Sequence, residues 1–157
     1  MSRTAVRFES RLLTPIEQAA RDTARRVSQK SMEITATAIS LNVDDPQASA
    51  AFLKQHFGFE EVMAADGFVS LTRADAGFNV IYLRTGLETF KPAALAGKRA
   101  DGLLIVFEVD DIDAEYDRMV SDGIEITTEI ETEEWGERFF QVTDPCGVVL
   151  QLVQWVS

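Results

Sequence analysis

The feature that constrains the fold most is an internal repeat. The stretch ISLNVDDPQASAAFLKQHFGFE begins at Ile39, and IVFEVDDIDAEYDRMVSDGIEI begins 66 residues later, at Ile105. Each copy opens with an alternating strand pattern that ends in Val-Asp-Asp, continues with apolar residues at helical spacing and leaves through a glycine. The repeat therefore predicts two structural units of the same kind.

Three further strand patterns follow the helix in each copy. They cover residues 60–63, 68–72 and 78–83 in the first copy, and 125–128, 138–142 and 148–153 in the second. Asp45 and Asp111 are suited to cap the two helices, and Asp144-Pro145-Cys146-Gly147 has the residue order of a type I turn. We therefore expect an α+β fold made of two βαβββ modules.

The chain divides into a tail and one domain of ordinary size. We expect residues 1–31 to form an N-terminal extension and residues 32–157 to form the domain, with modules at about 33–83 and 103–155 and a linker at 84–102.

The tail contains a helix signature. Thr14, Pro15 and Glu17 have the order of an N-cap, a first-turn proline and a capping-box glutamate. An amphipathic stripe follows, formed by Ile16, Ala19, Ala20, Thr23, Ala24 and Val27. Three interpretations stay open: a helix that docks on the domain or a partner, an arginine-rich transit peptide, and an extension upstream of Met32.

Charge separates the two parts of the chain. Residues 1–31 carry seven basic and three acidic side chains, a net charge of about +4. Because the whole chain has a net charge of −11, residues 32–157 carry about −15. An acidic domain repels phosphate backbones, which argues against nucleic acid as a partner. Such charge either attracts cationic compounds or serves solubility. No apolar run is long enough for a membrane span, and the single cysteine, Cys146, indicates the cytoplasm.

Several motifs together resemble the vicinal oxygen chelate superfamily, which includes glyoxalases, bleomycin-resistance proteins and extradiol dioxygenases. They are the doubled βαβββ pattern, the two Val-Asp-Asp segments, His56-Phe57-Gly58-Phe59, Trp135-Gly136 and Asp144-Pro145-Cys146-Gly147. The resemblance covers roughly residues 33–155. It implies two modules with pseudo-twofold symmetry, a cup-shaped mixed sheet around a small-molecule site, and a homodimer.

In metal-dependent members of that family, the first strand of each module supplies a histidine and the last strand a carboxylate. The matching positions here are Ala38, Tyr82, Leu104 and Gln151. Transition metals need imidazole, thiolate or carboxylate donors, so the resemblance implies no metal and no cofactor in this chain. His56 is interpreted as a packing residue at a helix end, and Cys146 as a turn residue rather than a nucleophile.

Strand alternation extends the predicted site from these positions. If Ala38 and Leu104 point into the cup, residues two and four further along the same strands do so as well. The candidate ligand-binding residues are Ser40, Asn42, Tyr82, Val106, Glu108, Trp135, Arg138 and Gln151. Glu108 either meets a ligand cation, acts as a general base, or pairs with Arg138 or Arg84 at a wet rim.

Three functions follow as hypotheses. The first is a metal-independent protein that sequesters an aromatic or cationic compound, with Trp135 as a stacking surface and nearby acidic residues as an attractive approach. The second is a metal-independent isomerase or lyase that uses Glu108 or Tyr82 for acid and base chemistry. The third is an accessory module whose N-terminal helix binds a partner protein.

Overall fold

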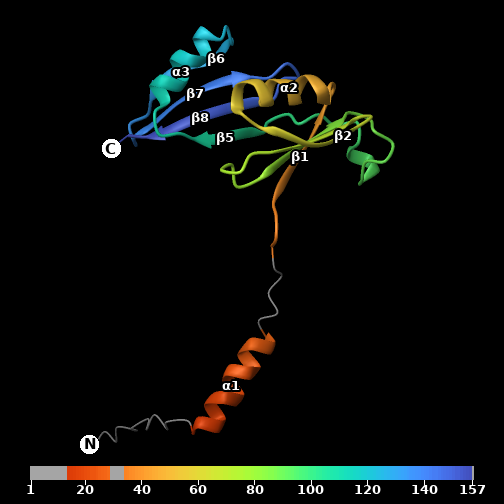
Figure 1. The fold of residues 1–157 in the computed structure, drawn as a ribbon, viewed down its shortest axis with the longest axis vertical. Helices are drawn as coiled ribbons and strands as arrows, with labels where there is room; N and C mark the ends of the chain where they lie inside the picture. Colours follow the sequence, from red (N-terminus) through yellow and green to blue (C-terminus); the bar gives the residue numbers. More distant parts are fainter. Residues whose placement is uncertain (1–13, 29–33, 157) are drawn as a thin grey trace, which may run out of the picture. The chain divides into compact units, whose positions relative to one another are not determined.

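The computed structural model describes residues 14–28 and 34–156, which form two compact units divided between Thr35 and Ala36 (Figure 1). The first unit contains the helix α1, Pro15–Ser28. The second contains, in order, β1 (Ala38–Val43), α2 (Pro46–Phe57), β2 (Glu60–Ala65), β3 (Phe68–Thr72), β4 (Asn79–Arg84), the 3₁₀ turn η1 (Ala93–Leu95), β5 (Leu104–Glu108), α3 (Ile112–Ser121), β6 (Ile126–Thr132), β7 (Glu137–Thr143) and β8 (Val149–Trp155).

The predicted N-terminal helix is confirmed, with the predicted capping box at its start. The Thr14 backbone N–H donates to Glu17 Oε2 at 2.8 Å, and the Glu17 N–H donates to Thr14 Oγ1 at 3.3 Å. These hydrogen bonds lower the pKa of the Glu17 carboxyl. Residues 14–22 are exposed, whereas the side chains of Thr23, Ala24 and Val27 and the predicted boundary after residue 31 lie outside the described residues.

The second unit repeats the order βαβββ, as predicted. Each module builds its own four-stranded mixed sheet, with the orders β1-β4-β3-β2 and β5-β8-β7-β6. In both sheets the first strand lies parallel to the last strand of its module, and the other neighbours are antiparallel. Parallel neighbours need a long crossover connection, which α2 and α3 with the intervening strands provide.

The predicted caps position the two helices. Asp45 accepts from the backbone N–H groups of Gln47 and Ala48 at 3.1 Å, and Asp111 accepts from that of Ala114 at 3.0 Å. The predicted turn at residues 144–147 is also present, because the Gly147 N–H donates to the Asp144 carbonyl at 3.0 Å. Local sequence therefore determines where each module's helix begins and where the last hairpin of module 2 turns.

One hydrophobic core joins the modules. Each helix packs on its own sheet, α2 on β3 and β4, and α3 on β7 and β8. Phe107 of the second module lies between aromatic rings of the first, with centroid distances of 5.3 Å to Phe57, 5.9 Å to Phe59 and 6.1 Å to Phe78. The helix-covered faces of both sheets therefore contribute to a common interior.

The opposite faces of the two sheets carry no helix of their own module. Strand register places these side chains on the open face of module 1: Ala38, Ser40, Asn42, Asn79, Ile81 and Leu83. It places these on the open face of module 2: Leu104, Val106, Glu108, Val149, Gln151, Val153, Phe139 and Gln141. Within the described parts of the chain, no helix is long and apolar enough to cross a membrane.

Candidate functional site

The first strand of each module shows the predicted alternation. In β1, Ala38 and Ser40 are exposed, whereas Leu41 and Val43 are buried. In β5, Leu104 and Val106 are 47% and 45% exposed, whereas Ile105 is buried. Ser40, Asn42, Val106 and Glu108 therefore lie on the open faces, where the alternation predicted them.

The prediction for the last strand of module 1 was wrong by one residue. Tyr82 is opposite Leu41 and fully buried on the helix-covered face, and Val80 lies on the same face, so neither lines a cup. The open-face position is Ile81, opposite Ser40. Burial raises the pKa of the Tyr82 phenol well above its usual value, with smaller contributions from Asp144 and Cys146. Tyr82 is therefore not an acid or base for a ligand on this face.

Gln151 lies at the centre of the open face of module 2, where the oxygen and the nitrogen of its amide each have a hydrogen-bond partner. Its Oε1 accepts from Gln141 Nε2 at 2.7 Å, and its Nε2 donates to Glu137 Oε1 at 3.1 Å. The side chain is only 8% exposed. A buried amide needs both a donor and an acceptor partner, and neighbouring strands supply them here.

Two further hydrogen bonds extend this pair into a row across the sheet. Thr128 Oγ1 donates to Gln141 Oε1 at 2.7 Å, and Trp135 Nε1 donates to Glu137 Oε2 at 3.0 Å. We call Thr128, Gln141, Gln151, Glu137 and Trp135 the amide row. It ends at the indole of Trp135, which is 65% exposed, so the hydrogen bonds of the row fix the orientation of a large aromatic surface that faces solvent.

The backbone beside Trp135 is held equally firmly. The Val156 N–H donates to the Gly136 carbonyl at 2.8 Å. Gly136 has φ of 90°, and a Cβ atom built there would lie 2.4 Å from the Val156 carbonyl oxygen. Only glycine fits this close approach. Trp155, opposite Glu137 in the β7–β8 ladder, is a second exposed indole on this end of the sheet.

Glu108 forms no ion pair with Arg138 or Arg84, because each arginine pairs with an aspartate instead. Arg138 lies on the helix-covered face of β7, where it pairs with Asp113 of α3 at 2.5 Å, so its assignment to the cup was wrong. Arg138 lowers the pKa of the Asp113 carboxyl. Arg84 pairs with Asp66 at 2.8 Å. Glu108 is exposed and has no ion pair or side-chain hydrogen bond within residues 14–28 and 34–156.

The sequence suggested that acidic residues near Trp135 attract a ligand, but one of these residues, Glu129, forms a hydrogen bond with another part of the chain. Glu129 accepts a short hydrogen bond from the Tyr116 hydroxyl on α3, which raises the pKa of that phenol. Glu137, which the sequence analysis did not select, is the carboxylate that contacts Trp135.

The residues at the expected ligand positions do not fit a transition metal. Ala38, Leu104 and Ile81 offer alkyl groups, and both polar atoms of the Gln151 amide have protein partners. In the part of the chain that the structure describes, no group of three or more His, Cys, Asp or Glu side chains is placed to hold a metal ion. The donor set therefore lacks the imidazole and carboxylate groups that such a site needs.

His56 and Cys146 occupy structural environments. The His56 ring packs on Phe52 at a centroid distance of 4.8 Å. Cys146 lies in the turn before β8, and its thiol points to the Asp45 carbonyl oxygen at 3.3 Å. Cys146 therefore connects the last hairpin to the cap of α2.

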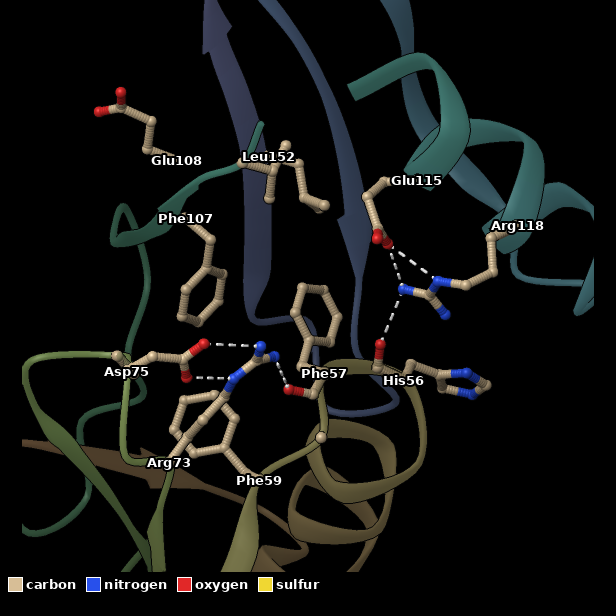
Figure 2. Close-up of a pocket in the computed structure, with 13 residues that line it drawn as sticks. His56, Phe57, Phe59, Arg73, Asp75, Phe107, Glu108, Glu115, Arg118 and Leu152 are labelled. Atoms are coloured by element: carbon tan, nitrogen blue, oxygen red, sulfur yellow. Dashed lines mark hydrogen bonds and ion pairs between the residues drawn. The ribbon is translucent and has the colours of Figure 1, made fainter. Parts of the chain in front are cut away.

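A cavity of about 340 Å³ lies where the modules meet (Figure 2). The aromatic side chains of Phe57, Phe59 and Phe107 line it, together with the two arginines Arg73 and Arg118. Arg73 donates to the Phe57 carbonyl at 2.6 Å, and Arg118 donates to the His56 carbonyl at 3.0 Å.

Both guanidinium groups are also bound by carboxylates. Arg73 is paired with Asp75 at 2.6 Å and Arg118 with Glu115 at 2.7 Å. Arg73 lowers the pKa of the Asp75 carboxyl. The two arginines satisfy carbonyls at the C-terminus of α2 and complete the joint between the modules, so we assign them a structural role.

Three members of the amide row, Thr128, Glu137 and Gln141, were not predicted from the sequence. The turn at residues 144–147 gave a partial signal for Gln141, which lies opposite Gln151 because the strands pair outward from Asp144 and Val148 and not from Thr143 and Val148. The hydrogen bond from Trp135 to Glu137 had no such signal.

The profile of the Glyoxalase/Bleomycin resistance protein/Dioxygenase superfamily matches residues 34–152. The chain belongs to this superfamily. The match confirms the resemblance and the predicted fold, with the difference that each module here forms its own sheet. No curated protein matches the chain.

Solved structures with this fold have varied descriptions. One is a glyoxalase/bleomycin resistance protein/dioxygenase from Nocardioides, with 22% identity, a TM-score of 0.69, and coverage of 88% of this chain and 94% of that chain. A lactoylglutathione lyase from Agrobacterium tumefaciens has 19% identity, a TM-score of 0.61, and coverage of 78% and 96%. TnmS3, an antibiotic binding protein from Streptomyces sp. CB03234, has 20% identity, a TM-score of 0.60, and coverage of 80% and 99%. Identities this low establish the shared fold alone.

Proposed function

We propose that the protein binds a small aromatic or cationic molecule on the open face of module 2, without a metal ion. The observation that carries the proposal is the amide row, in which Gln151 stands where the resemblance expects a carboxylate and which ends at the exposed Trp135. An indole beside a carboxylate is suited to a flat or positively charged ligand. The antibiotic-binding protein TnmS3, which has the same fold, adds support.

The surroundings of the amide row have the composition of a small-molecule site. Leu104 and Val106 supply exposed apolar surface, and Glu108 supplies a carboxylate with no partner in residues 14–28 and 34–156. Ligand sites combine mostly apolar walls with a few oriented polar groups. The polar groups of the amide row are fixed in place by hydrogen bonds before a ligand arrives, which reduces the entropic cost of binding.

One face of a sheet covers only one side of a ligand, whereas small-molecule sites bury most of the ligand surface. We therefore propose that a second copy of the chain supplies the opposite wall in a homodimer, in keeping with the exposed apolar side chains of β5. Exchanging Val106 for glutamate should convert the dimer to a monomer in size-exclusion chromatography with light scattering. The same change at Val120, which is 49% exposed on α3, is the matched control.

Titration calorimetry against a panel of glycopeptide and quinone antibiotics tests the binding function. We expect saturable binding to at least one compound, weakened at least tenfold by Trp135→Ala and less by Trp135→Phe, which keeps an aromatic face. Elemental analysis of protein purified without added metal salts should find no stoichiometric transition metal. A stoichiometric metal bound by the open face, or no binding to any compound, would contradict the proposal.

A second candidate function rests on Glu108. An exposed, unpartnered carboxylate on the open face could act as a general base in a metal-independent isomerase or lyase. Turnover of an aldehyde, lactone or hydroxy-acid panel that disappears in Glu108→Gln would favour this function over simple binding. Partner binding by α1 and a cytoplasmic location remain predictions from the sequence.

A further inference from the structure

A second recess lies on the other module, between the open face of module 1 and the linker. It is a groove of about 560 Å³, within the size range of small-ligand sites. Ser40, Asn42 and Leu83 form its sheet side, and residues 87–103 form its linker side. We call it the linker groove.

Hydrogen bonds from β1 hold the linker in position. The side-chain Nδ2 of Asn42 donates to the backbone carbonyls of Leu95 at 3.2 Å and Lys98 at 3.0 Å. The backbone carbonyl of Asn42 accepts from the Ala100 N–H at 3.1 Å. Two acceptors around Nδ2 fix the orientation of the amide. Asn42, which the sequence predicted as a ligand contact, is therefore a positioning residue that shapes the groove before any ligand binds.

The charge of the linker groove is opposite to that of the chain. Residues 32–157 contain eight basic side chains, and three of them, Lys91, Lys98 and Arg99, line this one groove. No aspartate or glutamate is among the residues that line it, although the whole chain has a net charge of −11. Cations gathered in a recess of an acidic protein create a local positive potential.

Of these three cations, the two lysines are available to bind a ligand. Arg99 is committed, because it pairs with Asp44 at 3.2 Å and donates to the Cys146 carbonyl at 3.1 Å. Lys91 and Lys98 are exposed and form no ion pair with any residue that the structure describes. The rest of the lining is largely apolar, with Leu83, Leu87, Phe90, Leu95 and Leu103.

We propose that the linker groove binds an organic anion: an apolar or aromatic body that carries one carboxylate or sulfonate group. The body packs on the leucine and phenylalanine side chains, and Lys91 and Lys98 bind the anionic group through charge-assisted hydrogen bonds. This site is separate from the amide row of module 2 and has the opposite charge preference, so it goes beyond the proposed function.

The probe for the test is 1-naphthoate, with 1-naphthylmethylammonium as a cation of similar shape, both followed by titration calorimetry with the full chain. We expect 1-naphthoate to bind, and the double variant Lys91→Gln/Lys98→Gln to weaken its binding about tenfold or more. Lys91→Arg/Lys98→Arg should retain the binding. Raising the salt concentration should weaken it in the wild type, because exposed charges are screened.

Two controls separate this site from other surfaces. Lys54→Gln removes a lysine outside the groove, from its pair with Glu61, and should leave naphthoate binding unchanged. Trp135→Ala should also leave it unchanged, even if that variant loses every ligand of the proposed function. The inference is overturned if 1-naphthoate fails to bind at millimolar concentration, binds no better than the ammonium compound to the Trp135→Ala variant, or binds the glutamine double variant as tightly as the wild type.

Discussion

The open faces of the two modules have the same strand order and corresponding register, but they differ in what covers them and in charge. In module 1, the linker lies against the face and brings lysine and arginine side chains to it. In module 2, polar side chains are joined into the amide row, and Leu104, Val106 and Trp135 remain exposed. A repeated backbone therefore presents two surfaces of different chemistry.

The difference teaches that the repeat determines the scaffold, whereas the residues that differ between its two copies, together with the linker, determine recognition. Ile81 and Gln151 occupy equivalent positions, opposite Ser40 and Val106. The first is an alkyl group, and the second is the centre of a hydrogen-bonded row. Sites on a common fold diverge through such exchanges.

The largest effect is expected at the end of the amide row. Gly136→Ala forces a side chain into positive φ and against the Val156 carbonyl oxygen at 2.4 Å, so the free energy of unfolding should fall by more than about 2 kcal/mol. Gly77→Ala in module 1 has φ of 71° but no atom within 4 Å, and should cost about 1 kcal/mol. Equal losses in urea unfolding would show that the contact with Val156 is unimportant.

A smaller effect is expected at the centre of the row. Gln151→Leu removes two hydrogen bonds and leaves Gln141 and Glu137 without those partners, which should cost about 1–3 kcal/mol. The equivalent change in module 1, Ile81→Leu, should cost less than about 1.5 kcal/mol because it conserves volume. Chemical denaturation measures both, and a neutral Gln151→Leu would show that the amide row does not stabilise module 2.

Tyr82→Phe distinguishes the two faces of module 1. The hydroxyl is buried with no hydrogen-bond partner in the described part of the chain, so its removal should change the free energy of unfolding by less than about 1 kcal/mol, or raise it. It should not affect ligand binding. If Tyr82→Phe weakened ligand binding, Tyr82 would have to be counted among the ligand-binding residues after all.

The same variant has a predicted pH dependence. Because the folded-state pKa of Tyr82 lies above its unfolded value of about 10, the wild type loses stability as the pH rises through that value, while the phenol ionises more readily in the unfolded chain. Thermal unfolding should show a shallower loss at alkaline pH for Tyr82→Phe.

The smallest effect concerns the helix-covered face of module 2. Arg138 lowers the pKa of Asp113 below its unfolded value, so the pair stabilises the protein at neutral pH, and that stabilisation disappears as the pH falls through the folded-state pKa. Asp113→Asn should slightly lower the melting temperature at pH 7, and the difference should shrink as the pH falls below the unfolded aspartate value of about 4 and vanish in stronger acid. A difference that persists in acid would point to packing instead of charge.

The sequence predicted most of the fold because its local signals agree with each other. The Val-Asp-Asp segments, the caps at Asp45 and Asp111 and the turn at residues 144–147 all have the predicted structure. In β1, apolar and polar residues alternate clearly enough to assign the faces, whereas β5 is apolar from Leu104 to Phe107 and its faces followed from its place in the repeat.

The site was less predictable, for reasons that differ by residue. In β4 the run Val80-Ile81-Tyr82-Leu83 is apolar throughout, so alternation did not reveal its face, and the phenol was mistaken for a cup residue. Arg138 was misplaced because long-range pairing with Asp113 has no local signal. The linker is largely irregular, so nothing in its sequence placed Lys91 and Lys98 beside β1 and β4.

The common interior has a consequence for the history of the duplication. Phe107 packs among Phe57, Phe59 and Phe78, so either half expressed alone would expose aromatic surface that the other half normally covers. An ancestral single module with this sequence pattern would have needed to associate with a copy of itself. Joining the two halves in one chain makes that partner permanent, so the halves can differ in their residues and still stay together.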